Sequence, residues 1–407
     1  MDAFNNEDFW LYVSMPFVSA IVGWGTNLVA IKMTFYPLTF WGIPPFLGWQ
    51  GIIPRKAEKM ASIAVDLMTT KLISVEELFD RLDPERVAKE MEPTMEVLIE
   101  TLTTDIMIEQ APALWEMLPL MVKDEIFRRV RNDAPNVIAR TMTEIKEHIG
   151  DLFDLKAMII DSLVRDRSLL NKVFQDVGHK EFKFIERSGL YFGFLFGCIQ
   201  MVIWIYYKGQ WQLPVCGFIV GYATNWLALK MIFEPVNPIK IGPWTIQGLF
   251  IKRQQEVASD YGALIASEIL NPENIIEGIL KGPSSDKLFK LIQRHVKRTI
   301  DSSTGITKPF IALTMGTHRY IQMKEMAVDK VLEHLPEGLS HLHAYTEEAM
   351  DIQTILREKM KQLTAEEFIG LLRPAFQEDE WILIMVGGAL GVAVGFFQLL
   401  VMFSGRI

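Results

Sequence analysis

The protein has 407 residues, of which 50% are hydrophobic and 22% are charged. So many charges exclude a wholly buried channel, and so much apolar sequence argues against an ordinary soluble enzyme, so apolar spans and polar blocks must alternate. The net charge of −9 gives no support for nucleic-acid binding. Two cysteines are too few for a disulfide scaffold or a cysteine-based zinc site.

Four apolar windows are long enough to cross the roughly 30 Å of hydrocarbon in a bilayer. They run from Phe9 to Ile31, from Gly189 to Tyr207, from Trp211 to Leu229 and from Trp381 to Phe403. Aromatic residues stand near the span ends, as in interfacial belts. We expect four transmembrane helices. The first is expected to be an uncleaved anchor, because Asp2, Glu7 and Asp8 precede it and no Lys or Arg does.

Four spans place two long polar blocks, about 38–188 and 236–380, on the same side of the membrane. Basic residues gather at the span ends on this side, whereas the other side has only Lys208 and Arg406. The positive-inside rule therefore predicts that both blocks are cytoplasmic.

The chain contains an internal repeat with an offset of 198 residues. Residues 23–37 read GWGTNLVAIKMTFYP and residues 221–235 read GYATNWLALKMIFEP, with eight of fifteen positions identical. The similarity continues into 43–61 and 241–258, and residues 197–200 correspond to residues 395–398. We interpret the chain as a tandem duplication with two spans in each half. Both halves then insert in the same direction, around a pseudo-two-fold axis along the membrane normal.

The expected fold is an all-α membrane protein with four transmembrane helices in two tandem repeats of parallel topology, each with a helical-bundle cytoplasmic domain. The expected segments are the first span with its TN-x-x-A-x-K-M motif (1–37), an interfacial segment plus the first helical cytoplasmic domain (38–188), the hairpin of spans two and three with the second motif copy (189–235), a second interfacial segment and helical domain (236–380), and the fourth span (381–407). The motif also carries small residues that would let the first and third spans pack closely. These are Gly23, Gly25 and Ala30 in the first copy, and Gly221, Ala223 and Ala228 in the second.

Polar residues in the motif predict a site between the two repeats. Its candidates are Thr26, Asn27 and Lys32 in the first copy and Thr224, Asn225 and Lys230 in the second. A buried amide needs partners, because lipid offers none. Three interpretations stay open for the asparagines: an interhelical hydrogen bond, a polar cavity for an ion, headgroup or small solute, and a position in the headgroup zone. The lysines are expected to extend toward lipid phosphates.

The segment after each motif copy combines aromatic residues, glycine and proline with a basic pair. The candidate headgroup contacts are Trp41, Trp49, Arg55 and Lys56 in the first copy and Trp244, Lys252 and Arg253 in the second. This composition is typical of a segment that lies at anionic headgroups. A loop packed under the cytoplasmic domain is the alternative.

The two polar blocks are predicted to be helical. Apolar residues recur at spacings of three and four, which predicts helix–helix packing. The two stripes are Ile138, Met142, Ile145, Ile149 and Leu152, and Leu288, Ile292, Val296 and Ile300. No phosphate-binding loop, nucleophile elbow or metalloprotease motif occurs, so we expect no catalytic residue and no cofactor. The nearest approach to a metal cluster, Glu333 to His343, has unsuitable spacing, and no metal is expected.

The TN-x-x-A-x-K-M helix, its proline stop and the following G-x-x-P-R-K resemble those of the YheB/YjiN-like bacterial membrane proteins, the domain of unknown function 445 family. The resemblance rests on residues 23–61 and 197–200 and would cover essentially the whole chain. It implies a bacterial inner-membrane protein and carries over no reaction and no catalytic residue. The second copy departs from the pattern at residues 251–253, where Ile-Lys-Arg replaces Pro-Arg-Lys. The basic pair is kept, but a role specific to Pro54 is not.

Two functions follow from these features. The first is a non-enzymatic scaffold that contacts the bilayer or a partner at the cytoplasmic face. The second is a transporter or a lipid- or solute-handling protein with a polar site between the repeats, which would need a dimer because four spans are few. An enzyme is disfavoured, since no site supports one. The expected partners are membrane lipids and a protein partner or second copy, and no nucleic acid.

Overall fold

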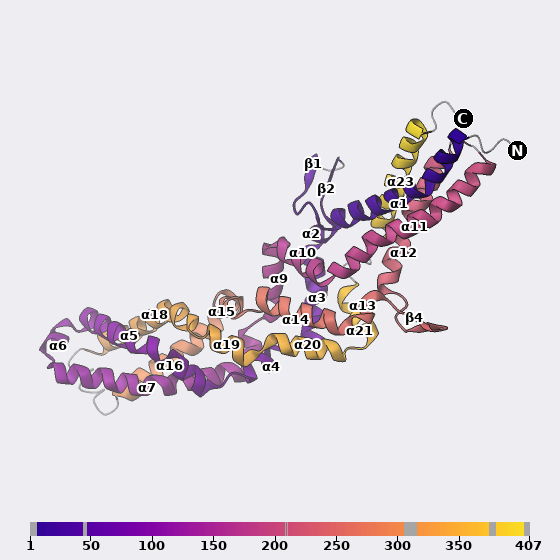
Figure 1. The fold of residues 1–407 in the computed structure, drawn as a ribbon. Helices are drawn as coiled ribbons and strands as arrows, with labels where there is room; N and C mark the ends of the chain where they lie inside the picture. Colours follow the sequence, from indigo (N-terminus) through magenta and orange to yellow (C-terminus); the bar gives the residue numbers. More distant parts are fainter. Residues whose placement is uncertain are drawn as a thin grey trace. The chain divides into compact units, whose positions relative to one another are not determined.

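The computed structural model describes residues 6–43, 47–207, 209, 211–304, 316–373 and 380–402. Regular structure within them is almost entirely helical (Figure 1), apart from two short β-hairpins. The chain divides into two compact units. Unit 1 comprises Met1–Leu72, Ser162–Ile265 and Leu356–Ile407, and unit 2 comprises Ile73–Asp161 and Ala266–Ile355.

Unit 1 contains the apolar helices and both hairpins. Its elements are α1 (Asn6–Phe35), β1 (Trp41–Ile43), β2 (Leu47–Trp49), α2 (Ile52–Arg55), α3 (Ala57–Lys71), α10 (Arg167–Val177), α11 (His179–Tyr206), α12 (Gln212–Phe233), β3 (Ile239–Ile241), β4 (Trp244–Ile246), α13 (Leu249–Lys252), α21 (Ala365–Leu372) and α23 (Glu380–Met402). Three further helices contain a boundary between the units: α9 (Leu155–Arg165), α14 (Gln254–Glu268) and α20 (Ile352–Gln362).

The prediction of four apolar helices long enough to span a bilayer is confirmed. The candidate spans are Tyr12–Phe35, His179–Tyr206, Gln212–Phe233 and Glu380–Leu400. The helix of the second span begins at His179, well before the expected start at Gly189, because its charged first turns continue the apolar helix without a break. Lys208 and Arg406, used to orient the chain, lie outside the described residues, as does Phe403.

The four apolar helices form two antiparallel pairs, α1 with α11 and α12 with α23. In the first pair, Gly189, Gly193 and Gly197 lie against the backbone near Gly23, Ser19 and Pro16, and the second pair repeats this with Gly387, Gly391 and Gly395. A side chain on Gly23 or Gly189 would collide with the facing backbone. The close approaches therefore join spans one and two, and spans three and four, whereas the sequence suggested spans one and three. The signal that identifies them is the four-residue glycine spacing in α11 and α23.

Each motif helix is followed by a β-hairpin and one short helical turn. Strand β1 pairs antiparallel with β2, and β3 with β4. The backbone N–H of Gly51 donates to the Pro37 carbonyl, and that of Gly248 donates to the Pro235 carbonyl. These hairpins differ from the purely helical expectation. Tight pairing of three-residue strands satisfies backbone polar groups in segments whose prolines and glycines disfavour a helix.

Unit 2 is built from helices of both polar blocks. Its elements are α4 (Val75–Asp80), α5 (Pro84–Gln110), α6 (Pro112–Met117), α7 (Leu120–Glu147), α8 (Ile149–Leu152), α15 (Pro272–Lys281), α16 (Ser285–Thr304), α18 (Thr317–Ser340) and α19 (His343–Met350). Helix α5 packs against α7 and α18, and α16 packs against the same two helices. The four long helices therefore form one bundle, where the sequence suggested a separate bundle for each block.

The two apolar stripes expected from the sequence meet in this bundle. Leu152 lies in one buried cluster with Leu288 and Ile292, and Ile145 and Val296 pack against it. Glu144 of α7 is held by two consecutive residues of α16: His295 Nε2 lies 2.6 Å from Glu144 Oε2, and Arg294 pairs with Glu144 Oε1. The hydrogen bond from His295 lowers the pKa of Glu144. The long helices of one polar block alone would leave their apolar stripe exposed. Burial of the two stripes against each other therefore favours a bundle that combines both blocks.

The glycine contacts lead to a matched pair of substitutions. Gly23→Ala places a methyl group against the Gly189 carbonyl and should destabilise the protein by about 1–3 kcal/mol through forced separation of α1 and α11. Gly25→Ala is the control, because a methyl group there meets nothing within 4 Å. Thermal unfolding of the purified full-length protein measures both. Equal loss in the two variants would contradict close packing at Gly23.

Candidate functional site

The two motif asparagines are buried and each makes the same interhelical hydrogen bond. Asn27 Nδ2 donates to the Ile185 carbonyl of α11 at 2.6 Å, and Asn225 Nδ2 donates to the Leu383 carbonyl of α23 at 2.8 Å. Donor and acceptor both shift by 198 residues. Among the described residues, Oδ1 of neither asparagine has a hydrogen-bond partner. Each amide thus joins the two helices of its own pair.

The motif threonines serve their own helices. Thr26 Oγ1 donates to the Gly23 carbonyl at 3.1 Å, and Thr224 Oγ1 donates to the Gly221 carbonyl at 3.3 Å. Each hydroxyl group therefore bonds a carbonyl in the preceding turn of its own helix and makes no hydrogen bond to another helix. The threonines therefore pack as small side chains whose hydroxyl groups already have hydrogen-bond partners.

The motif lysines are exposed and differ from each other. Lys32 has no ion-pair partner among the described residues. Lys230 Nζ lies 5.0 Å from the centroid of the Trp226 ring and 3.7 Å from Glu234 Oε2. Both lysines follow the asparagines by five residues and stand in the last turn of their helices, where a cation is favourable.

One small cavity lies among all four apolar helices. Its lining comprises Ala30, Ile31, Thr34, Phe182, Ile185, Asn225, Leu229 and Leu383, and its volume is about 20 Å³. That space holds about one water molecule, whereas small-molecule sites occupy several hundred Å³. Asn225 lines it and Asn27 does not, so the six motif residues do not converge on one ligand-sized site in this conformation.

The hairpins carry exposed apolar side chains. Trp41 and Ile43 of β1 are 78% and 70% exposed, and Ile239 and Ile246 of the second hairpin are 52% and 46% exposed. Figure 1 shows the two hairpins projecting on opposite sides of the bundle in unit 1. Trp49 instead anchors the first hairpin, because its Nε1 donates to the Met33 carbonyl of α1 at 3.0 Å. The side chain of Trp244 and residues 44–46 lie outside the described part of the structure.

The basic pair of the second copy is divided between two roles. Lys252 is exposed, whereas Arg253 is only 20% exposed and pairs with Glu181 of α11 and Glu256 of α14. Glu181 is itself 1% exposed. In the first copy, Arg55 is exposed and Lys56 is half-buried. Arg253 thus tethers α13 to α11, a role that its sequence context did not reveal.

The ion pairs around Arg253 include one more partner, Lys180 of α11, which also bonds Glu256. Hydrogen bonds from Arg253 and Lys180 lower the pKa of Glu256 to about 2. Burial disfavours the charge on Arg253, but its bonds to Glu256 and Glu181 outweigh that effect and raise its pKa. Arg253 and Glu256 therefore both stay charged near neutral pH, so the ion pair between them persists there.

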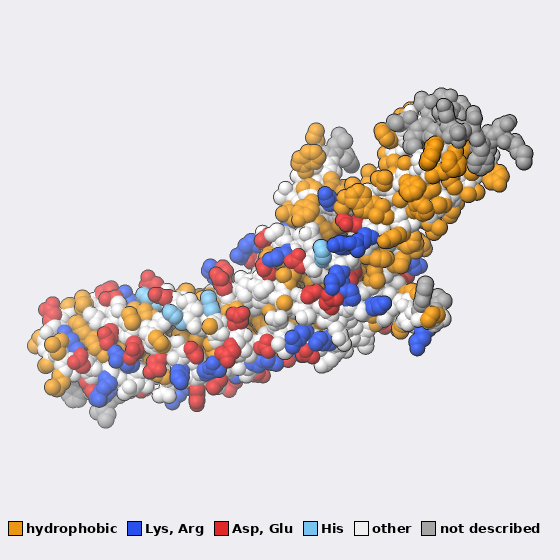
Figure 2. Space-filling model, in the orientation of Figure 1, with side chains coloured by type: hydrophobic (Ala, Val, Ile, Leu, Met, Phe, Trp, Pro, Cys, Tyr) orange, Lys and Arg blue, Asp and Glu red, His pale blue; other side chains and the backbone are white. Residues whose placement is uncertain are grey.

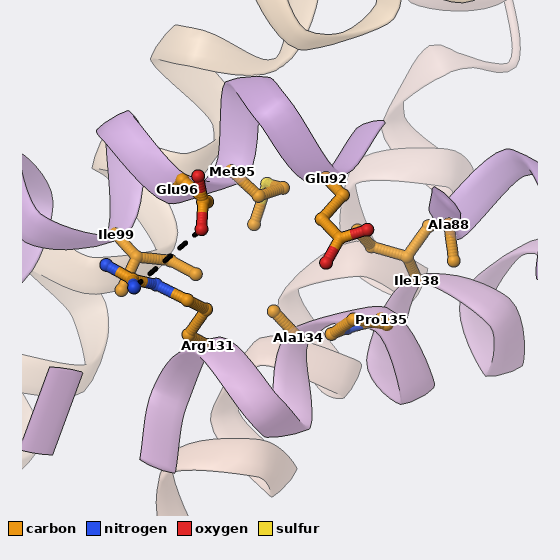
Figure 3. Close-up of a pocket in the computed structure, with 9 residues that line it drawn as sticks. All are labelled: Ala88, Glu92, Met95, Glu96, Ile99, Arg131, Ala134, Pro135 and Ile138. Atoms are coloured by element: carbon orange, nitrogen blue, oxygen red, sulfur yellow. Dashed lines mark ion pairs between the residues drawn. The ribbon is translucent and has the colours of Figure 1, made fainter. Parts of the chain in front are cut away.

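Unit 2 contains a second small cavity, between α5 and α7 (Figure 3). It measures about 10 Å³ and is lined by Glu92, Glu96, Arg131 and Pro135, among others. Arg131 spans the helices through Glu100 at 2.7 Å and Glu96 at 3.7 Å. In the described chain, no three His, Cys, Asp or Glu side chains are grouped to hold a metal. This cavity is therefore a packing gap beside an ion pair.

The chain is similar to proteins named UPF0754 membrane protein. It is 30% identical over 136 residues to that of Shouchella clausii, covering 31% of this chain and 35% of that one. It is 32% identical over 142 residues to that of Bacillus pumilus (33% and 36%), and 32% identical over 98 residues to that of a Cyanothece species (23% and 24%). The chain thus matches about a quarter to a third of the length of these curated relatives.

No family model and no solved structure matches the chain. The resemblance to the domain of unknown function 445 family therefore stays a prediction. The relatives are bacterial membrane proteins by name, and four helices here are long and apolar enough to cross a membrane. The chain is a helical membrane protein.

Substitutions at Arg253 and Lys252 test whether Arg253 stabilises the fold or contacts lipid headgroups. Arg253→Leu leaves the buried Glu181 carboxylate without its counter-charge and should cost about 3–5 kcal/mol of unfolding free energy. Lys252→Leu, at the exposed neighbour, should change it by less than about 0.5 kcal/mol. Chemical unfolding of the full-length protein measures both, and Glu181→Leu added to Arg253→Leu should restore much of the loss. Equal, small effects of both single substitutions would assign Arg253 to the headgroups.

Proposed function

We propose that the protein is a non-enzymatic component of a bacterial inner membrane whose two tandem halves insert in the same direction and hold both hairpins against the cytoplasmic surface of the bilayer. The large helical blocks are then cytoplasmic and serve as a scaffold for a protein partner or a second copy. Membrane lipids are the direct partners, and nucleic acid is not one.

The exposed apolar hairpins carry this proposal. Each begins within a few residues of the end of an apolar helix, and hydrogen bonds to the helix end restrain it: Trp49 to Met33 in the first copy, and Gly248 to Pro235 in the second. A hairpin restrained at a helix end lies at the depth of that end. Its exposed tryptophan and isoleucines then have lipid, and not water, as their surroundings.

The same direction of insertion is supported by contacts that recur with one offset. The Asn27–Ile185 and Asn225–Leu383 bonds, the glycine contacts and the hairpins are all separated by about 198 residues from their counterparts. An antiparallel pair returns the chain to the side on which it started. Two such pairs in series therefore keep both hairpins on one side of the membrane.

Fluorescent labels on the hairpins test both depth and sidedness. In a background with Cys198→Ala and Cys216→Ala, we expect single cysteines at Ile43 and Ile239, each carrying an environment-sensitive fluorophore, to be quenched by nitroxide lipids in vesicles. A label at the exposed Lys89 of α5 is the unquenched control. In spheroplasts, a membrane-impermeant thiol reagent should reach none of the three.

Two outcomes would contradict the proposal. Labelling of one hairpin but not the other in spheroplasts would place the halves in opposite directions. If the labels on both hairpins emitted like the α5 control, the hairpins would not lie in the lipid.

The alternative is a transporter with a solute site between the repeats, for which the small cavity that Asn225 lines would have to widen. Native mass spectrometry of the purified protein distinguishes the two functions. Our proposal predicts bound lipid but no stoichiometric solute, and an Asn27→Leu/Asn225→Leu variant that loses about 1–2 kcal/mol of stability per interhelical bond while keeping its lipids. A solute present in the natural protein and absent from this variant would replace the proposal with the transporter.

A further inference from the structure

The outward face of α11 begins with two basic residues that the fold leaves unpaired. Lys183 and Arg187 are four positions apart on one continuous helix and therefore project from the same side. Both are exposed, and neither has an ion-pair partner among the described residues. Glu186 is three positions after Lys183 and therefore lies near it on the helix surface, but among the described residues it forms no ion pair with Lys183 or Arg187.

The same row of α11 continues as lipid-facing surface. Tyr191, Leu195, Ile199 and Ile203 follow at intervals of four and are 72%, 56%, 50% and 43% exposed. We call the row from Lys183 to Ile203 the α11 ridge. Figure 2 shows an apolar outer surface on the bundle, with basic side chains at its border. This row is inclined to the helix axis and turns about 40° around it at each step, so the ridge presents two cations, then an aromatic ring, then aliphatic side chains in order along that inclined row.

The second half has the same row without the charges. The positions 198 residues after Lys183 and Arg187 are Trp381 and Met385 of α23, which are 64% and 45% exposed. Trp381 is typical of the bilayer interface, so Lys183 lies at that level and Arg187 one turn deeper. A guanidinium in lipid at that depth is costly unless it reaches an anion, and methionine at the same position carries no such cost.

We propose that the α11 ridge binds one anionic phospholipid, with its phosphate between Lys183 and Arg187 and an acyl chain along Leu195 and Ile199. Arginine and lysine one turn apart can both donate to the phosphate oxygens. The site exists in one half only, since α23 lacks both cations. The inference rests on the proposed function only in taking the start of α11 as the cytoplasmic membrane surface.

The second half supplies its own test residues. Lys183→Trp/Arg187→Met gives α11 the pair that α23 already carries at these positions, so the fold should survive. In nanodiscs of phosphatidylglycerol and phosphatidylcholine, native mass spectrometry should show the natural protein retaining one phosphatidylglycerol. The variant should lose roughly 30-fold in preference for the anionic lipid, the ratio that two basic residues near an anionic surface provide.

The reciprocal change provides a gain of binding. Trp381→Lys/Met385→Arg should add a second retained phosphatidylglycerol, and Lys183→Arg/Arg187→Lys should keep the first. Unchanged lipid retention in both exchange variants would overturn the inference, as would displacement of the lipid by inorganic phosphate at millimolar concentration. Quenching of the hairpin labels is measured separately. A natural protein that retains no phosphatidylglycerol although its hairpin labels are quenched refutes the ridge alone, and retained phosphatidylglycerol with unquenched hairpin labels refutes the proposed function alone.

Discussion

The contact between two antiparallel apolar helices, closed by glycines and one buried asparagine, is the interaction on which the rest of unit 1 depends. Lipid offers no hydrogen-bond partner and little hydrophobic drive for helices to associate. Close backbone approach at Gly23 and Gly189, and the bond from Asn27 to the Ile185 carbonyl, supply that association. The asparagine bond also sets the axial register, because a shift of one residue would leave the amide without its acceptor.

That register determines what happens at the ends of the helices. Once α12 is fixed against α23, the backbone bond from Gly248 to Pro235 positions the second hairpin, and Arg253 then meets the buried Glu181 of α11. The hairpins are therefore held at a fixed height relative to the helix ends. They need this constraint, since two paired three-residue strands are not stable by themselves.

The charges at the helix ends divide between internal and external partners. Arg253 and Lys180 are used within the fold, where they hold α11, α13 and α14 together through Glu181 and Glu256. Lys183 and Arg187, further along α11, are exposed and have no ion-pair partner among the described residues. Counting basic residues near span ends treats all of these alike. Only the residues packed around each basic side chain distinguish one that forms an ion pair within the fold from one that can contact the membrane.

The sequence by itself determined the four apolar helices, the 198-residue offset and the helical nature of the polar blocks. These depend on composition and period within single segments, which survive any arrangement in space. The stripes around Ile145 and Ile292 were also readable as packing surfaces, because a helix that repeats apolar residues at three and four must bury them.

Tertiary structure alone decided which surfaces meet. Gly23 of α1 faces α11, the two stripes share one bundle, and Arg253 is internal. The sequence also left undecided whether Asn27 bonds another helix, a ligand or the headgroups. Each of these outcomes depends on residues more than 70 positions apart being brought together. A small, polar or apolar surface fits several partners, and only the packing of the rest of the chain decides which of them it contacts.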